Sequence, residues 1–142
     1  MAIKLKLDGW DELLEAVRKT TGDVDAEARR CIERSAQIFQ EELKKAIVDK
    51  GDSEGAARLA RRMPGYEIEG SGDRLTAHIG FKSTSYDPDN LSDYFKATFL
   101  NYGTPRERPR EFVKSAKSAA NKRISEEQEK AFANMTKGLT NK

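Results

Sequence analysis

The 142-residue chain has 26 basic and 24 acidic side chains, a net charge of +2 and only 37% hydrophobic residues. That length fits one domain with a small core, and the near-neutral charge argues against a dedicated nucleic-acid binder, which usually has a strong basic excess. The single cysteine excludes an internal disulfide. The sequence has no apolar stretch long enough for a membrane span or a signal peptide, so we expect a soluble protein made in a cytoplasm.

Charge is spread unevenly along the chain. Residues 105–142 hold 10 basic and 5 acidic side chains, a net of +5, whereas residues 1–104 hold 16 and 19, a net of −3. Oppositely charged parts can pair within one chain or between neighbouring copies.

The first 50 residues predict a strand and two helices. Ile3, Leu5 and Leu7 alternate with lysines, which indicates a short strand with one buried face. A leucine-rich helix is expected over 8–22, capped by Asp8 and ended by Gly22. A long helix follows from Asp23 to about residue 50, with one stripe of apolar and small side chains and an opposite solvated face. The stripe consists of Ala28, Cys31, Ile32, Ser35, Phe39, Leu43, Ala46 and Ile47.

The middle of the chain predicts a loop and a hairpin. Three glycines and Pro64 mark residues 51–65 as a mobile loop or arm, although 56–63 can form one or two helical turns. Tyr66 and Ile68 alternate before the turn sequence GSGD, and alternation resumes from Leu75 to Phe81. Residues 83–90 have the composition of a loop.

The last third predicts two helices. The aromatic spacing in 94–102 fits a strand or a helix, and we favour a short helix that ends at Gly103. A long helix starts at Phe112; Ser125 and Gln128 can break it by forming a capping box, and the tail after 139 should fray. The sequence thus predicts a single α+β domain over 1–142. Its small antiparallel or mixed sheet is packed by one long central helix, with a long C-terminal helix.

The segment FLNYGTPRERPREF at 99–112 has an unusual pattern. Gly103 supplies a turn, and the two prolines restrict the backbone, so we expect a stiff, extended bridge. Phe112 should anchor its far end in the core. Three charged side chains should project outward, where they are available to a neighbouring protein or else are ordinary solvent-exposed charges: Arg106, Arg108 and Arg110.

Residues suited to catalysis are scarce. His78 falls on the polar face of a hairpin strand and Cys31 on an apolar stripe, and no third group is evident to orient them as a nucleophile pair. One histidine and one cysteine cannot form a structural zinc site, and no glycine-rich phosphate loop is present. We therefore expect no catalytic, metal or cofactor residues. A second basic cluster, in addition to the one at 106–110, consists of Arg58, Arg61 and Arg62.

Two stretches resemble the phage gene-product-ten-like tail-component family. The start, IKLKLDGWDELLEAVRK, is similar to the family's short strand, glycine and leucine-rich helix, through Gly9 and Leu13. The stretch FLNYGTPRERPREFVKSA is similar to its aromatic residue, Gly-Thr, Pro-x-x-Phe and alanine. Family members often carry an acidic residue where this chain has Asn101. The matching positions in the second stretch are Phe99, Gly103, Thr104, Pro109, Phe112 and Ala116.

The resemblance implies a structural, non-enzymatic protein from the neck of a long-tailed phage. Such proteins act in tail completion or head–tail joining, usually as rings of six copies around the DNA channel. The implied partners are other copies of the chain, neighbouring connector or tail proteins, and duplex DNA that passes without sequence reading. The implied location is the virion, and the host cytoplasm during assembly. The alternative is a nucleic-acid-associated module that uses the arginine clusters, and a small hydrolase has little support.

Overall fold

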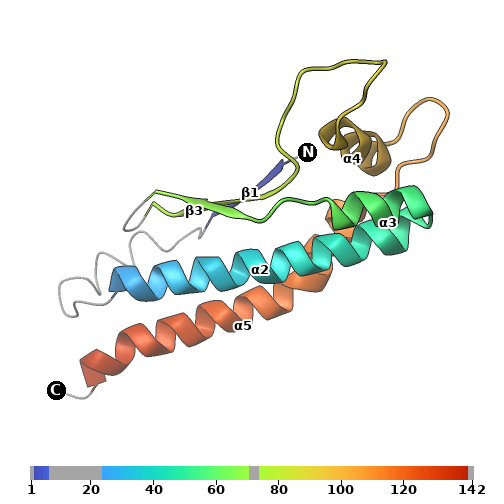
Figure 1. Cartoon of the computed structure of the whole chain (residues 1–142). Coiled ribbons are helices and arrows are strands. Elements are labelled where there is room, and N and C mark those ends of the chain that lie inside the picture. The colour runs from blue at the N-terminus through green and yellow to red at the C-terminus, as the bar shows by residue number, and fades with distance from the viewer. Residues whose placement is uncertain (1, 7–23, 71–73, 141–142) are drawn as a thin grey trace.

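The computed structural model describes residues 2–6, 24–70 and 74–140. Its elements in chain order are β1 (Ala2–Lys6), α2 (Val24–Gly51), α3 (Glu54–Arg61), β2 (Glu67–Glu69), β3 (Thr76–Gly80), α4 (Asp93–Tyr102) and α5 (Phe112–Thr140). The sheet lies on one side of α2 and α5 on the other (Figure 1). This is the α+β fold class that the sequence predicts. The helix predicted over 8–22, with Gly9 and Leu13, and the end of the predicted frayed tail lie outside the described ranges.

The sheet is antiparallel, with β3 between the other two strands in the order β1-β3-β2. Its register pairs Ile3 with Ile79 and Ile68 with Ala77. Ala77 and Ile79 are buried, whereas the side chain of His78 between them is partly exposed. One face of β3 therefore packs against α2. The predicted first strand and the two paired strands of the predicted hairpin are confirmed, whereas most of the GSGD turn lies outside the described ranges.

Helix α2 is buried on two sides. Toward the sheet, Gln37 and Gln40 hold Tyr66: the Gln37 amide donates to the Tyr66 hydroxyl at 3.1 Å, and Gln40 Oε1 accepts from the Tyr66 backbone N–H at 3.1 Å. On the other side lies α5. Because α2 has two packing partners, its buried surface is wider than the single predicted stripe and also includes Ala36 and Ile38.

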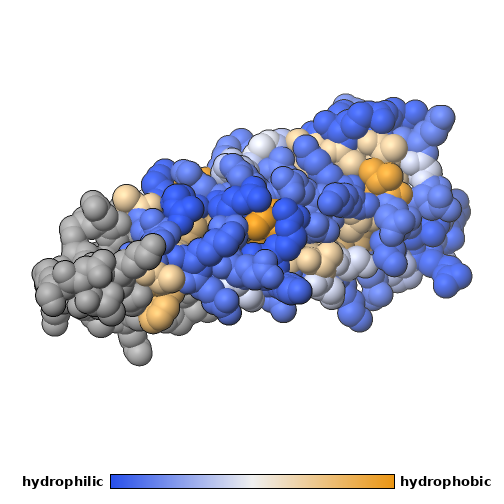
Figure 2. Space-filling model, turned by 90° about the horizontal axis from the view of Figure 1, so that it is seen from below, coloured by the Kyte–Doolittle hydropathy of each residue, from blue (hydrophilic) through white to orange (hydrophobic). Residues whose placement is uncertain are grey.

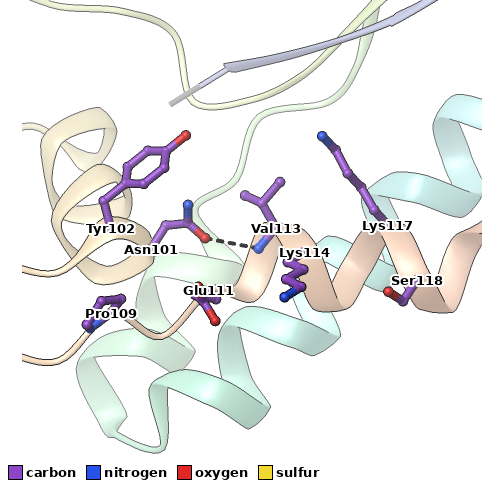
Figure 3. Close-up of a pocket in the computed structure, with 8 residues that line it drawn as sticks. All are labelled: Asn101, Tyr102, Pro109, Glu111, Val113, Lys114, Lys117 and Ser118. Atoms are coloured by element: carbon purple, nitrogen blue, oxygen red, sulfur yellow. Dashed lines mark hydrogen bonds between the residues drawn. The ribbon is translucent and has the colours of Figure 1, made fainter.

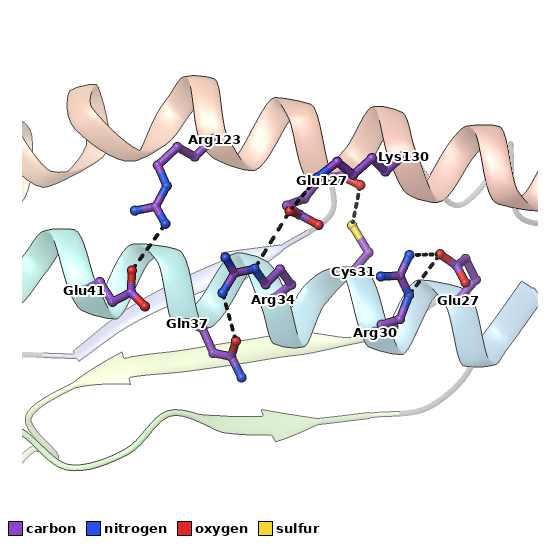
Figure 4. A network of polar contacts seen from close by, with 9 residues as sticks. All are labelled: Glu27, Arg30, Cys31, Arg34, Gln37, Glu41, Arg123, Glu127 and Lys130. Atoms are coloured by element: carbon purple, nitrogen blue, oxygen red, sulfur yellow. Dashed lines mark hydrogen bonds and ion pairs between the residues drawn. The ribbon is translucent and has the colours of Figure 1, made fainter.

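The α2–α5 interface combines small buried side chains with ion pairs (Figure 4). Ala116, Ala120 and Ala131 of α5 are buried. Arg123 reaches Glu42 at 3.0 Å and Glu41 at 3.3 Å, and Arg34 reaches Glu127 at 3.8 Å. Arg123 before the predicted capping box, Glu127 within it and Asn134 after it thus contact α2. The break predicted at Ser125 and Gln128 is wrong, because packing along α2 keeps α5 continuous.

Helix α3 replaces most of the mobile loop or arm predicted over 51–65. Ser53 caps the helix, since its hydroxyl accepts from the Ala56 N–H at 3.1 Å. Ala56, Leu59 and Ala60 are buried, which packs α3 against α2. Gly51 is a packing residue rather than a loop marker, because a Cβ there would lie 2.3 Å from the Cβ of Ala56. The structure therefore confirms the alternative prediction that residues 56–63 form helical turns.

Helix α4 settles the ambiguity over 94–102 in favour of a helix that ends at Gly103. Its aromatic side chains stack edge-on with each other and with the preceding loop: the ring of Phe95 lies 5.1 Å from that of Tyr94 and 5.2 Å from that of Tyr86. Phe99 packs on the other side of Phe95, with ring centres 6.1 Å apart. The cluster attaches the 83–92 loop to α4, at the same end of the molecule as α3 (Figure 1).

Candidate interaction surface

The segment between α4 and α5 closes on itself in a tight turn. Thr104 and Glu107 exchange two backbone hydrogen bonds, of 3.0 and 3.2 Å, and the Thr104 hydroxyl also accepts from the Glu107 N–H. The predicted extended bridge is therefore wrong for 104–107. The prolines restrict the backbone as expected, but Pro105 occupies a corner of this turn rather than a straight run. The result is a compact loop over 103–111 that projects from one end of the molecule (Figure 1).

Gly103 fixes the start of this loop. Its backbone has φ +80° and ψ 175°, a conformation in which almost only glycine is found. A Cβ at this position would lie 2.8 Å from Pro109 N and 2.9 Å from Glu107 O. The glycine of the Gly-Thr pair is thus required both by its backbone angles and by the close return of the loop.

The far end of the loop is tied to α4 and to the core. The N–H groups of Arg110 and Glu111 donate to the carbonyl oxygens of Leu100 and Asn101 at 2.9 and 3.1 Å. The buried side chain of Asn101 accepts from the Val113 N–H at 3.1 Å, which satisfies an open N–H in the first turn of α5. A carboxylate at this position could accept the same bond.

Phe112 is 1% exposed, so the predicted anchor in the core is confirmed. Ala116, one turn later, is also buried. A cavity of about 450 Å³ opens beside this junction (Figure 3). It is lined by Asn101, Tyr102, Pro109, Glu111, Val113, Lys114, Lys117 and Ser118.

The three arginines of the loop are exposed, as predicted. Arg106, Arg108 and Arg110 form no ion pair with any other residue that the structure describes. Their backbone is held by the hydrogen bonds above, so the side chains extend from a fixed base. What they contact stays a prediction.

The second arginine cluster is divided among different contacts. Arg62 donates two hydrogen bonds to Asp93, of 3.1 and 3.0 Å, which tie α3 to the start of α4. Arg58 lies 3.7 Å from Glu54 within α3. Arg61 lines an open groove between α2 and α3. Arg62 therefore has a structural role, and the cluster does not present three free charges to a partner.

The fold also brings charged residues that are far apart in the sequence together at one end of the molecule. The end of the molecule that holds α3, α4 and the loop includes residues 44–62 and 93–118, which carry 12 basic and 6 acidic side chains. The remaining parts of the two long helices, 24–43 and 119–140, carry 7 basic and 8 acidic side chains. One end is strongly positive, and the rest of the two long helices is nearly neutral.

The two candidate catalytic residues, Cys31 and His78, interact with different partners. Cys31 is buried, and its thiol donates to the carbonyl oxygen of Glu127 at 3.8 Å. Burial raises the pKa of this thiol from 9.0 to about 11, so little thiolate exists at neutral pH. His78 bonds Glu69 on the neighbouring strand instead, with 2.9 Å between Nε2 and Oε2. The two side chains thus have different partners and form no nucleophile pair.

Among the described residues, no group of three or more His, Cys, Asp or Glu side chains is placed to hold a metal ion. No helix in the same ranges combines the length and the apolar character of a membrane span.

Comparisons of the chain with protein-family models, with curated proteins and with solved structures found no match.

Proposed function

We propose that this chain is a structural subunit of a phage neck or tail end, which acts in tail completion or head–tail joining as a ring around the DNA channel. The proposal starts from the resemblance carried by Gly103, Thr104, Pro109 and Phe112. The observation that supports it most is the 103–111 loop, whose exposed arginines have no ion-pair partner among the described residues. They would bind an adjacent subunit or a neighbouring connector or tail protein.

The loop has the properties of a contact site between subunits. Its backbone is already ordered by hydrogen bonds at both ends, so docking would cost less conformational entropy than docking of a flexible arm. The positive end of one copy would attract the first part of α2 in the next copy, since residues 24–43 carry five acidic and three basic side chains. A head-to-tail contact of this type closes into a ring when its rotation closes.

The test compares two triple charge reversals. The first, R106E/R108E/R110E, changes the loop. The control, R29E/R74E/K82E, makes the same change in net charge at three exposed positions outside the loop. Both variants should remain folded by circular dichroism, since exposed charges contribute at most about 1 kcal/mol each. Light scattering across a concentration range and negative-stain electron microscopy then report assembly.

We expect open rings from the wild-type protein and from the control, and none from the loop variant. Rings formed by the loop variant would contradict the role given to the loop. If the wild-type protein stays monomeric at every concentration, assembly needs a partner, and phage that lack the protein should accumulate filled heads and detached tails. Normal virions from such a phage would refute the proposed function.

A further inference from the structure

The first half of α5 presents an exposed face that carries only positive charge. Residues 112–125 contain four basic side chains and no acidic one. Arg123 turns inward to Glu41 and Glu42 of α2. The other three are exposed and form no ion pair with any residue in the described ranges: Lys114, Lys117 and Lys122.

Two more cations extend this face beyond the helix. An open groove of about 660 Å³ is lined by Lys50 at the end of α2, Arg110 of the loop and Lys114. Glu111 is the only carboxylate that lines it, and its other lining residues are Ser115, Ser118 and Ala119. We call Lys50, Arg110, Lys114, Lys117 and Lys122 the lysine stripe. Lys114 and Lys117 leave α5 in different directions, so the stripe covers a broad arc (Figure 3).

Short polar side chains lie between the lysines: Ser118, Asn121 and Ser125 are exposed there. Apolar surface borders the stripe at one end, where the exposed Tyr102 and the partly buried Val113 line the cavity beside Lys114 and Lys117. The view from the α5 side shows mostly hydrophilic residues (Figure 2). The short side chains between Lys117 and Lys122 let a charged polymer approach the helix backbone closely.

Duplex DNA matches the length and charge of this surface. Lys114 and Lys122 are eight residues apart, which is about 12 Å along the helix axis. Duplex DNA carries one negative charge per about 1.7 Å of its axis, so this length of duplex offers about seven phosphates. Lysine makes point-charge contacts to phosphate, whereas sequence reading needs hydrogen bonds to base edges.

We infer that the lysine stripe binds the phosphate backbone of duplex DNA without sequence preference. The inference deepens the proposed function and rests on it for its setting, because it places this face of α5 toward the DNA channel. The surface shares only Arg110 with the arginine clusters that the sequence singles out, and the ion pairs of Arg58 and Arg62 leave these two outside it.

The test is fluorescence polarisation with a labelled 30-base-pair duplex at salt concentrations from 50 to 200 mM. Five phosphate contacts predict a slope of log K against log salt of about −4.5, which is an affinity loss of about 500-fold over this range. The variant K114Q/K117Q/K122Q keeps two contacts, so its slope should fall to about −1.8 and its loss to about 12-fold.

The matched control is K96Q/R106Q/R108Q, which removes three exposed cations from the same end of the molecule. Its slope should stay near the wild-type value. Absence of binding at 50 mM salt, an unchanged slope in the stripe variant, or an equal change in the control would overturn the inference. Tighter binding to polyglutamate than to DNA would assign the stripe to an acidic protein and would overturn it as well.

Electron microscopy of the same proteins separates this inference from the proposed function. If rings form but K114Q/K117Q/K122Q binds DNA as the wild-type protein does, the inference alone is contradicted. The proposed function alone would be contradicted by two results together. The protein would bind DNA through the stripe without ever assembling, and phage that lack the protein would form normal virions.

Discussion

Replacing Gly103 with alanine should destabilise the protein through backbone strain and steric overlap together. The residue has φ +80° and ψ 175°, and an alanine held in this region costs about 1–3 kcal/mol in backbone strain. The new methyl group would also meet Pro109 N at 2.8 Å, Glu107 O at 2.9 Å and Pro109 Cδ at 3.0 Å.

The atoms that the methyl group meets belong to backbone and to a proline ring, so they cannot rotate away. Relief requires a shift of the whole turn, which would strain the hydrogen bonds between Thr104 and Glu107. We therefore expect a total loss of about 2–4 kcal/mol in the free energy of unfolding. For a chain of this length that is a fall in Tm on the order of 10 °C.

The assay is urea unfolding followed by circular dichroism, with two other glycines as controls. Gly65→Ala adds a methyl group with no atom within 4 Å and should be neutral or slightly stabilising. Gly55→Ala lies inside α3, where the nearest atom is 3.8 Å away, and should stabilise by about 0.5–1 kcal/mol. If Gly103→Ala is as stable as Gly65→Ala, the strained turn described above does not exist.

Three further predictions concern caps and the buried thiol. Ser53→Ala removes the acceptor for the Ala56 N–H and should cost about 1 kcal/mol in urea unfolding. Asn101→Ala leaves the Val113 N–H unpaired and should cost about 1–3 kcal/mol, whereas Asn101→Asp keeps an acceptor and should cost less. For Cys31, the native pKa of about 11 exceeds the ordinary 9.0, so between these pH values only the native state keeps the proton. Stability should fall across that window by at most about 3 kcal/mol, and Cys31→Ala should flatten this part of the pH profile.

Local patterns were sufficient to predict much of the fold. The strands around Ile3 and Ile79 are recognised from apolar residues that recur every two positions. The buried stripe of α2 is recognised from apolar residues that recur three and four positions apart. These spacings are visible without any tertiary contact. The core position of Phe112 followed in the same way, from an aromatic residue at the start of a helical pattern.

The failures depend on contacts distant in sequence or on backbone geometry. The turn at 104–107 is closed by hydrogen bonds between Thr104 and Glu107, and Arg110 and Glu111 are bonded to the end of α4. The proline-rich composition revealed neither set of bonds. Gly51 was interpreted as flexibility, although it is small because α3 packs against it. The predicted break in α5 overlooked Arg123 and Glu127, whose partners are on α2.

The candidate site was only partly predictable for a similar reason. The exposure of Arg106, Arg108 and Arg110 followed from composition, but the diversion of Arg62 to Asp93 needed the packing of α3 beside α4. The lysines of the stripe on α5 contribute to the net charge of +5 over residues 105–142, which the sequence shows. Their grouping with Lys50 and Arg110 was missed because it depends on the packing of α5 beside the end of α2.

The small residues between α2 and α5 affect how much apolar surface the chain exposes while it is being synthesised. Helix α5 is made after α2 and all three strands, so the α2 face that it covers stays open to water until then. Cys31 on that face is small, and its neighbours Arg34 and Glu41 are charged. A partly made chain therefore exposes little apolar surface there and has little tendency to aggregate before α5 arrives.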